Sequence, residues 1–449
     1  MQMNENDIRA LCQKILGYSQ ADQTEVIFSG TQGALTRFAV NHIHQNVAED
    51  NAEVSIRAVV GKRIGVVATN ALDDASLQRT VERATEIARL QPENPEWNSL
   101  PGPQPITKVT TFSDATAAFT PESRAQGVSH VVKLAKERGF EAAGAFETNV
   151  YHIGIANSLG VWAYEPRTEA EFHAVVMADG NGSGWTQRMS IDAGTFDFEA
   201  MAREAVDKAD RSRNPIAIDI GEYETILDSY AVADLFQNLS FMGINAMSQR
   251  EGSGPLVGKL GEKVADSRIT LVDDASNTLT EASSFDYEGQ PKQRTPIIEN
   301  GIARNVIYDS FNALLEGKPN TGNALPAPNR FGPLALNLAL EPGTASLDEM
   351  IRSVKRGIYV TRFHYTNIVH PVKAIFTGMT RDGTFLIEDG QITRPVRSFR
   401  FVQDIWAALN NVKAIGRDRV LARDYVAVLT PALHIGSWSY TGVQSGGEE

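Results

Sequence analysis

The histidines are the first residues whose type and spacing could support chemistry. His42 and His44 are two residues apart, so in a strand both side chains would share a face and could offer two imidazoles to a metal ion. His364 and His370 flank a short segment in the second half of the chain. Neither pair has an obvious third ligand nearby, and strand histidines are more often exposed than metal-bound. We therefore interpret all four as surface or packing residues, with an autonomous metallohydrolase as the alternative.

Acidic pairs and a glycine-rich segment are the next candidates. Asp273 with Asp274, and Asp286 with Glu288, could chelate Mg²⁺ or share a proton. Such residues are more often solvated in turns, and we expect these four to be exposed there. The glycines between 252 and 261 resemble a phosphate-binding loop in composition only, because no strand leads in and a proline interrupts the helix that should follow. We interpret that segment as a turn with close backbone packing.

The common catalytic motifs are absent from the sequence. It contains no G-x-x-x-x-G-K-[ST] phosphate loop, no G-x-S-x-G nucleophile turn and no H-E-x-x-H zinc helix. Cys12 is the only cysteine, which excludes an intrachain disulfide and a cysteine-rich zinc site. The residues alone therefore indicate no catalytic centre, and they favour a reducing compartment.

Composition and charge describe an ordinary globular protein. The chain has 449 residues and a mass of 49.0 kDa, with 42 Lys and Arg against 55 Asp and Glu, a formal net charge of −13. An acidic chain without a basic block argues against direct nucleic-acid binding, which depends on clustered cations. No apolar run approaches the ~18 residues that would span a bilayer. The first residues also lack the apolar core of a signal peptide. We expect a cytoplasmic protein that binds no membrane.

The elements of the first half mix helices and strands. Apolar residues at helical spacing predict helices near 8–16, 77–88, 121–138 and 197–210. Alternating residues from Val54 to Val67 predict a hairpin that turns at Gly61. The proline-rich stretch 92–121 is expected to be a surface connection. The main boundary is placed near residue 215, at an Asn-Pro pair.

The second half contains one predicted helix and many turn signals. The helix covers about 229–248, where Leu235, Leu239, Met242 and Ala246 form an apolar stripe. Asn-Gly at 300–301 and Asp-Gly at 389–390 predict two tight hairpins. The predicted fold class is α+β with two domains: an amino-terminal mixed α/β domain at 1–215 and a β-rich carboxy-terminal domain at 216–449.

Several long segments together carry a family resemblance. They are NHIHQNVAEDNAEVSIRAVVGKRIGVVATN and ANSLGVWA in the first half, and REGSGPLVGKLGEKVADSRITLVDD, DYEGQPKQRTPIIENGIARNVIYD, LNLALEPGTASLDEMIRSVKRGIYVTRF and GTFLIEDGQITRPVRSFRF in the second. On these segments the chain resembles the TldD/PmbA family, also described as a modulator of DNA gyrase, over nearly its whole length. The resemblance implies a cytosolic protease of two related subunits, TldD and TldE (PmbA), of which only the TldD-type chain holds zinc.

The resemblance also implies where that zinc helix falls in this chain. The family pattern is H-E-x-x-x-H followed by a later cysteine, with two imidazoles and a thiolate as ligands and the glutamate as base. Counted back from Gly252, Gln237 stands at the first histidine, Asn238 at the glutamate and Met242 at the second histidine. An amide is a poor zinc ligand, Asn cannot take up and return a proton, and a thioether prefers softer metals. Since no cysteine follows Cys12, we predict a degenerate metal site, no catalytic residues and no cofactor.

These features make a non-catalytic, TldE/PmbA-like subunit the leading hypothesis. Its expected partner is a TldD-type zinc peptidase subunit in a heterodimer, or a second copy of itself in a homodimer. The expected substrates are small or unfolded peptides held as extended strands. One alternative is a stand-alone homodimeric module that binds peptides or regulates a partner without proteolysis. The other is the autonomous metallohydrolase, with an unrecognised site.

Overall fold

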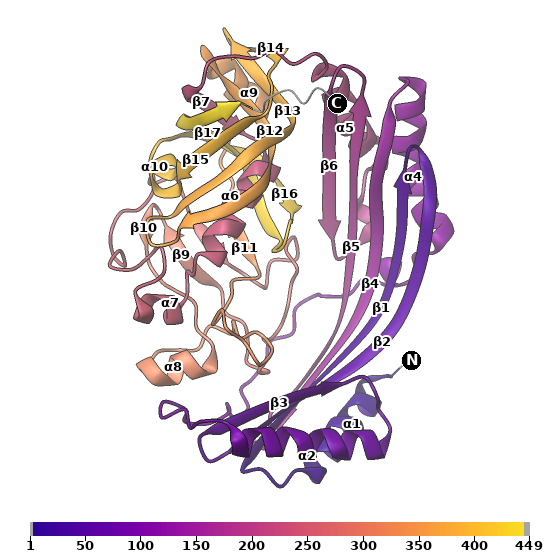
Figure 1. The fold of residues 1–449 in the computed structure, drawn as a ribbon, viewed down its shortest axis with the longest axis vertical. Helices are drawn as coiled ribbons and strands as arrows, with labels where there is room; N and C mark the ends of the chain where they lie inside the picture. Colours follow the sequence, from indigo (N-terminus) through magenta and orange to yellow (C-terminus); the bar gives the residue numbers. More distant parts are fainter. Residues whose placement is uncertain (1–2, 444–449) are drawn as a thin grey trace.

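The protein is built around two β-sheets that face one another (Figure 1). The structure is a computed structural model, and it describes residues 3–443. The first sheet is antiparallel, and its strands lie in the order β3-β2-β1-β4-β5-β6. These strands are β1 (Gln23–Ala39), β2 (His42–Val60), β3 (Arg63–Thr69), β4 (Glu141–Asn157), β5 (Trp162–Ala178) and β6 (Gly182–Ser190).

The four central strands of this sheet are long and form a curved wall (Figure 1). β2 has 19 residues and β1, β4 and β5 have 17 each, against about 5–6 in an average strand. Val40 and Asn41 make the tight turn between β1 and β2, with φ values of 49° and 61°. β2 and β3 pair through the turn at Gly61, so the hairpin predicted for 54–67 is confirmed.

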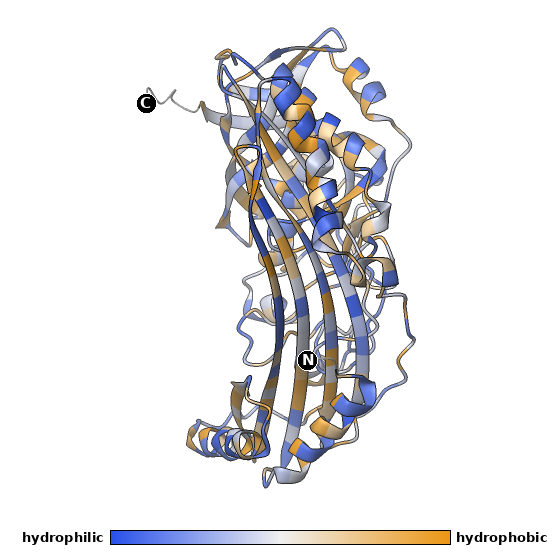
Figure 2. Cartoon of the chain, turned by 90° about the vertical axis from the view of Figure 1, so that its right-hand side faces the viewer, coloured by the Kyte–Doolittle hydropathy of each residue, from blue (hydrophilic) through white to orange (hydrophobic). Residues whose placement is uncertain are grey.

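Helices cover the two ends of the first sheet, and its middle has no helix over it on the outer face (Figure 2). The helices of this half, with one 3-10 turn, are α1 (Glu5–Tyr18), α2 (Asp74–Leu90), α3 (Asp114–Ala117), α4 (Pro121–Glu137), η1 (Ala193–Thr195) and α5 (Phe198–Arg211). α1 and α2 pack at one end of the long strands, and α4 and α5 pack at the other. Each begins with a side chain that caps its free amides, and the four helices predicted for this half are confirmed.

The second sheet is mixed and has eleven strands. They are β7 (Gly221–Leu227), β8 (Leu271–Asp273), β9 (Thr295–Glu299), β10 (Ile302–Ala303), β11 (Leu338–Leu340), β12 (Arg356–His370), β13 (Ile375–Glu388), β14 (Gln391–Pro395), β15 (Phe399–Asp404), β16 (Val412–Ala422) and β17 (Val428–Val443). β7, β12, β13, β15 and β17 form a closed ring of pairings, because β17 pairs with both β15 and β7. The largest hydrophobic cluster of the molecule is built around this ring.

In the described part of the second half, residues 216–443, there are five helices, and they differ from the prediction. They are α6 (Ser229–Phe241), α7 (Ala246–Glu251), α8 (Ser310–Glu316), α9 (Leu347–Ser353) and α10 (Ile405–Asn410). α6 packs against β12 and β17, and nearly all of its residues are buried. The prediction of one continuous helix over 229–248 is wrong. Gly243, with φ of 96°, ends the helical path after α6, and the Asn245 side chain caps the start of α7.

The two Asn-Gly and Asp-Gly turns lie where the sequence predicts them. Asn300 and Gly301 have φ values of 50° and 78° between β9 and β10, and Asp389 and Gly390 have values of 48° and 78° between β13 and β14. Both hairpins, and the α+β fold class, are confirmed.

The connection between the sheets contains the predicted domain boundary. The strands of the first sheet end at Ser190, those of the second begin at Gly221, and residue 215 lies between them. The division into two domains at that residue stays a prediction. Among residues 3–443, no helix is long and apolar enough to cross a membrane.

Candidate functional site

α6 carries the residues that the family resemblance assigns to the degenerate metal site, and its start is held by both halves of the molecule. Oδ1 of Asp228 accepts a hydrogen bond from the Ser229 amide at 2.7 Å. The other oxygen of Asp228 accepts from Lys208 of α5 at 3.0 Å and from the hydroxyl of Tyr359 on β12. Because three elements meet at one carboxylate, the helix has a fixed position relative to both sheets.

Gln237 uses its whole side-chain amide to hold a loop of its own chain. Its Oε1 accepts hydrogen bonds from the backbone amides of Tyr425 at 2.8 Å, Val426 at 3.1 Å and Asp424 at 3.3 Å. Its Nε2 donates to Oδ1 of Asp234 at 2.9 Å. The side chain therefore ties α6 to the connection between β16 and β17.

Asn238 and Met242 also have structural contacts. Nδ2 of Asn238 donates to the backbone oxygen of Asp234 at 2.8 Å, to its Oδ1 at 3.2 Å and to Oγ1 of Thr366 at 3.3 Å. Met242 is 3% exposed and lies in the main hydrophobic cluster. Both residues contribute to packing around the end of α6.

The three side chains do not fit a zinc ion. The Gln237 oxygen already accepts backbone hydrogen bonds, Asn238 directs its nitrogen at other acceptors, and Met242 offers a thioether among apolar groups. No group of three or more His, Cys, Asp or Glu side chains in the described part of the chain is arranged to hold a metal ion. This end of α6 supplies contacts between elements instead of metal ligands.

A cavity of about 310 Å³ lies beside these residues, and we name it the α6 cavity. Its lining comes from both sheets, from α6 and from the connection between β16 and β17, and includes Glu171, His173, Trp185, Gln187, Tyr230, Asp234, Arg362, His364, Thr366, Arg423 and Asp424. The guanidinium of Arg362 lies 4.1 Å from the centre of the Trp185 ring, which joins β12 to β6 across the cavity. A polar cavity next to the end of α6 is therefore part of the fold.

Asp234 is the carboxylate around which this region is organised. Its Oδ1 accepts hydrogen bonds from Gln237, Asn238 and Thr366. Burial raises the pKa of Asp234 to about 7, and these hydrogen bonds only partly oppose the effect. The carboxyl group consequently changes its charge near neutral pH.

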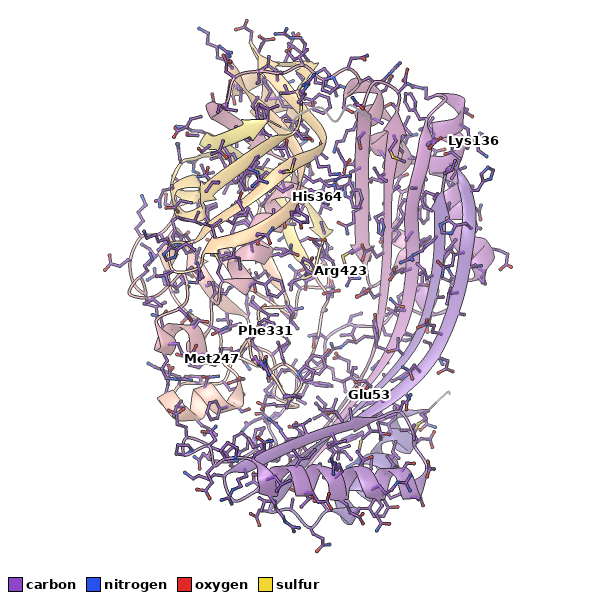
Figure 3. All side chains as sticks on the ribbon, in the orientation of Figure 1. Glu53, Lys136, Met247, Phe331, His364 and Arg423 are labelled. Atoms are coloured by element: carbon purple, nitrogen blue, oxygen red, sulfur yellow. The ribbon has the colours of Figure 1, made fainter. Side chains whose placement is uncertain are left out.

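Arg423 lies between the two sheets (Figure 3), and it forms ion pairs with three carboxylates. It lies 2.9 Å from Glu169 and 2.7 Å from Glu171, both on β5, and 3.0 Å from Glu281 in the loop after β8. Burial alone would raise the pKa of Glu171, but His173 and Arg423 outweigh it and lower that pKa to about 2. Glu171 lines the α6 cavity and Glu169 lines a second cavity, so Arg423 contacts lining residues of both.

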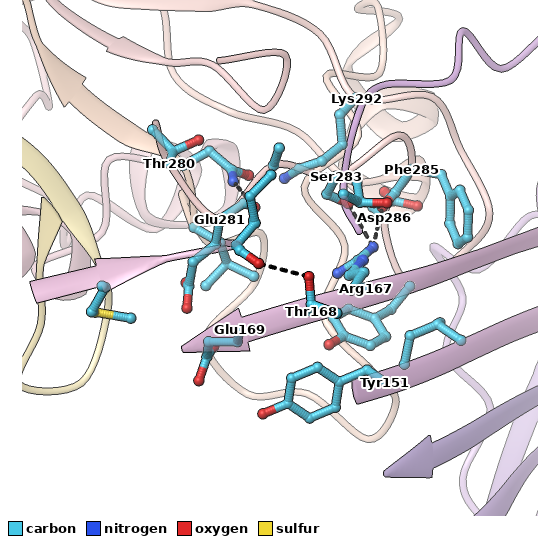
Figure 4. A pocket seen from close by; sticks show the side chains of 18 of the residues that line it. Tyr151, Arg167, Thr168, Glu169, Thr280, Glu281, Ser283, Phe285, Asp286 and Lys292 are labelled. Carbon is cyan, nitrogen blue, oxygen red and sulfur yellow. Dashed lines mark hydrogen bonds between the residues drawn. The ribbon is translucent and has the colours of Figure 1, made fainter. Parts of the chain in front are cut away.

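The second cavity has a volume of about 320 Å³, and we name it the loop cavity. Strands β4, β5 and β6 supply one side, including Tyr151 and Glu169, and the segments 280–292 and 323–337 supply the other (Figure 4). Figure 4 shows Lys292 reaching into it from the loop, opposite the strands. Pockets of roughly 300–1,000 Å³ are typical of small-molecule sites.

The acidic pairs near this cavity are not the exposed turn residues that we expected. Asp273, Asp286 and Glu288 are buried. Asp286 accepts hydrogen bonds from the amides of Glu288, Gln290 and Ala324, while burial and the nearby Glu288 raise its pKa to about 7. The expectation is wrong because folding brings backbone amides and cations to these carboxylates, and turn statistics contain no such information.

The histidines are not brought together. His42 and His44 are exposed on β2, His370 is exposed at the end of β12, and only His364 lines the α6 cavity. Burial and the nearby Arg381 and Arg362 lower the pKa of His364. The structure therefore gives no common site for these four residues.

Sequence reasoning missed four residues that matter here: Asp234, Lys292, Asn337 and Arg423. Asp234 had a usable signal, because it precedes Gln237 by three residues and Asn238 by four, which places all three on one helix face. The other three lie on loops or strand ends and meet only in the folded chain.

Comparison with models of known protein families identifies the family to which this fold belongs. Family models match the chain in succession: PmbA/TldA metallopeptidase domain 1 over residues 24–88, the central domain over 102–213 and the C-terminal domain over 220–442. The two facing sheets and the buried helix are thus those of a metallopeptidase-like protein. More particularly, the chain belongs to the TldD/PmbA family.

Individual relatives agree with this assignment. The chain is 25% identical over 412 residues to a metalloprotease TldD homolog of Haemophilus influenzae, covering 85% of this chain and 83% of that protein. It is 27% identical over 258 residues to a metalloprotease of Methanothermobacter thermautotrophicus, and this match spans only 56% of either chain, little more than half of that relative.

Solved structures share the fold. TldE from Thermococcus kodakarensis is similar with a TM-score of 0.89 at 21% identity, covering 97% of this chain and 100% of that one. A protein described as a modulator of a DNA gyrase from Thermotoga maritima has a TM-score of 0.86 at 18% identity, with 96% and 100% covered. At these identities the likeness concerns the fold.

Proposed function

We propose that this chain is a non-catalytic, TldE/PmbA-like subunit that pairs with a TldD-type zinc peptidase in the cytoplasm. The observation that carries the proposal is the end of α6, where Gln237, Asn238 and Met242 have hydrogen bonds and packing partners within their own chain. Side chains already used in this way are unable to hold zinc or to accept a proton from a zinc-bound water. Hydrolysis then depends on another subunit.

The contribution of this chain to the complex is shape and binding surface. The long concave sheet and the second sheet enclose polar cavities that include main-chain and side-chain groups from both halves. Such a lining suits extended peptides without stable structure, since main-chain hydrogen bonds do not depend on side-chain identity. Small or unfolded peptides are therefore the proposed substrates of the complex.

Co-expression with a TldD-type chain from the same genome tests this proposal. We expect the two chains to co-purify through a tag on either one, and the pair to cleave an unfolded peptide faster than the TldD-type chain alone. Separate purification of each chain provides the control. If the two chains migrate separately in size-exclusion chromatography and mixing adds no peptidase activity, the proposed role is wrong. A chain that forms a stable homodimer and binds peptide with no such partner would support the stand-alone module instead.

A further inference from the structure

The loop cavity contains a lysine that forms no direct ion pair in the described part of the chain. Lys292 lines the cavity, and no carboxylate among residues 3–443 lies within ion-pair distance of its ammonium group. The carboxylates nearby have other partners: Glu169 and Glu281 contact Arg423, and Asp286 accepts three backbone amides. Burial lowers the pKa of Lys292, and the charges of Asp273 and Asp286, which have hydrogen-bond partners of their own, only partly oppose this effect.

The same cavity contains an acceptor that has no donor. Asn337 is 2% exposed and lines the cavity, and its Oδ1 has no hydrogen-bond partner in the described chain. Its Nδ2 donates to the backbone oxygen of Glu281 at 2.7 Å, which fixes which end of the amide remains free. A buried acceptor without a donor costs about 1–3 kcal/mol, so such groups are uncommon unless a ligand or water satisfies them.

The backbone around both groups is held in place. Oδ1 of Asp273 accepts a hydrogen bond from the backbone amide of Asn337 at 2.9 Å, and its Oδ2 accepts one from Nδ2 of Asn323 at 2.6 Å. Gly322, with φ of 73°, passes so close to Lys292 that a Cβ there would lie 2.7 Å from the lysine Cα. The backbone that carries Asn337 and Lys292 is therefore packed within the fold, and the Asn337 side chain is buried there.

Apolar side chains complete the lining. Met189 of β6, Leu421 of β16 and Leu334 border the cavity, with the aromatic rings of Tyr151 and Phe285. A ligand that fits must therefore present an anion to Lys292, an N–H or O–H donor to Asn337 and an apolar portion to these side chains.

We propose that the loop cavity binds the carboxy-terminal residue of a peptide, with its α-carboxylate on Lys292, its main-chain N–H on Oδ1 of Asn337 and its side chain among the apolar groups. One peptide residue carries these three features within a few ångströms. A free apolar amino acid shares the chemistry, because its ammonium group can replace the N–H. The inference deepens the proposed role in peptide handling by naming the part of the peptide that this chain recognises.

Binding to the isolated full-length chain tests the site. The probes are a short N-terminally labelled, unstructured peptide ending in leucine, the same peptide with a carboxamide end, and free leucine as competitor. Fluorescence anisotropy should show the free acid binding about tenfold or more tightly than the carboxamide, because the carboxamide offers the Lys292 ammonium no negative charge. Competition by leucine at concentrations similar to those of the peptide acid would assign the site to free amino acids.

Variants separate the site from general charge effects. Lys292→Met should bind the acid and the carboxamide equally weakly. Lys292→Arg should keep part of the preference for the acid. Lys318→Met, at an exposed lysine of the same half, is the control and should bind both peptides as the wild type does. Equal binding of acid and amide by the wild type, or a preference that survives in Lys292→Met, would overturn the proposal. The acid and amide comparison on the wild type keeps the test decisive even if a variant folds poorly.

The same variants keep this inference apart from the proposed subunit role. Lys292→Met should still co-purify with the TldD-type chain, because Lys292 lines an internal cavity. Loss of the carboxylate preference with assembly intact supports the binding site. A wild-type chain that prefers the free acid yet fails to assemble would contradict the subunit role alone.

Discussion

The α6 cavity and the loop cavity are both lined by carboxylates that contact Arg423, and their surroundings differ in how the polar groups are satisfied. Beside the first, Gln237 and Asn238 have partners within the chain, and Asp234 in its lining accepts three hydrogen bonds. In the second, the ammonium group of Lys292 and Oδ1 of Asn337 are left without partners.

This difference distinguishes polar groups that hold the fold together from polar groups that remain free to bind a ligand. Around the end of α6, polar side chains hold elements of the fold together, and their removal should cost stability. Where polar groups remain unsatisfied inside a rigid lining, their removal should cost little stability and should change binding.

The largest expected effect comes from breaking the Gln237 contacts. Gln237→Leu keeps the approximate volume but leaves the amides of Tyr425 and Val426, and Oδ1 of Asp234, with fewer partners. We expect the free energy of unfolding to fall by about 2–4 kcal/mol, measured by urea denaturation. Gln293→Leu, at an exposed glutamine, is the matched control and should change it by less than about 0.5 kcal/mol. Equally small effects in both variants would show that the Gln237 contacts do not stabilise the fold.

The next effect concerns the charge of Asp234. Its pKa of about 7 in the folded chain is above the ordinary value of 3.8, so the folded state binds the proton more tightly. This contribution to stability is complete below pH 3.8 and is lost as pH rises through 7. Asp234→Asn has no carboxyl group to titrate, so this loss is absent in the variant. We therefore expect the difference in free energy of unfolding, variant minus wild type, to increase by about 1–3 kcal/mol as the pH is raised from 4 to 8.

Urea denaturation of both proteins at the two pH values measures this change. Asp418→Asn, at an aspartate whose side chain is 85% exposed, serves as control and should show no comparable pH dependence. A relative stability of Asp234→Asn that is constant with pH would mean that Asp234 is charged in the folded chain over the whole range.

The smallest stability effect is expected in the loop cavity. Lys292→Met removes an ammonium group with no ion pair in the described chain, so its free energy of unfolding should change by less than about 0.5 kcal/mol or increase slightly. Thermal and urea unfolding beside the Gln237 variant measure the contrast directly. A loss as large as that of Gln237→Leu would show that the two cavities do not differ in the way described.

Local sequence rules predicted elements whose causes are local. The amphipathic helices α2 and α4 and the turns at Asn300-Gly301 and Asp389-Gly390 depend on spacing and on residues that tolerate positive φ, and all of them are present. The break after α6 was missed because an apolar stripe continues across Gly243 in the sequence, while the chain itself turns there.

The site depends on contacts that no local rule contains. The family resemblance located Gln237, Asn238 and Met242, but their partners come from the connection after β16 and from β12. Arg423 meets Glu169 across 254 positions of sequence, and Asn337 meets Asp273 across 64. Burial of carboxylates such as Asp273 depends on these distant partners. Because local sequence rules do not include such partners, they place these carboxylates at the surface.

The zinc content of the assembled complex shows which of the two chains holds the metal. We would co-purify this chain with a TldD-type chain and measure zinc per pair by mass spectrometry, once with the wild-type partner and once with the histidines of the partner's zinc helix replaced by alanine. We expect one zinc per pair in the first complex and none in the second, with peptidase activity lost in parallel. Zinc that remains in the second complex, or that this chain binds tightly when purified alone, would rule out the proposed non-catalytic role.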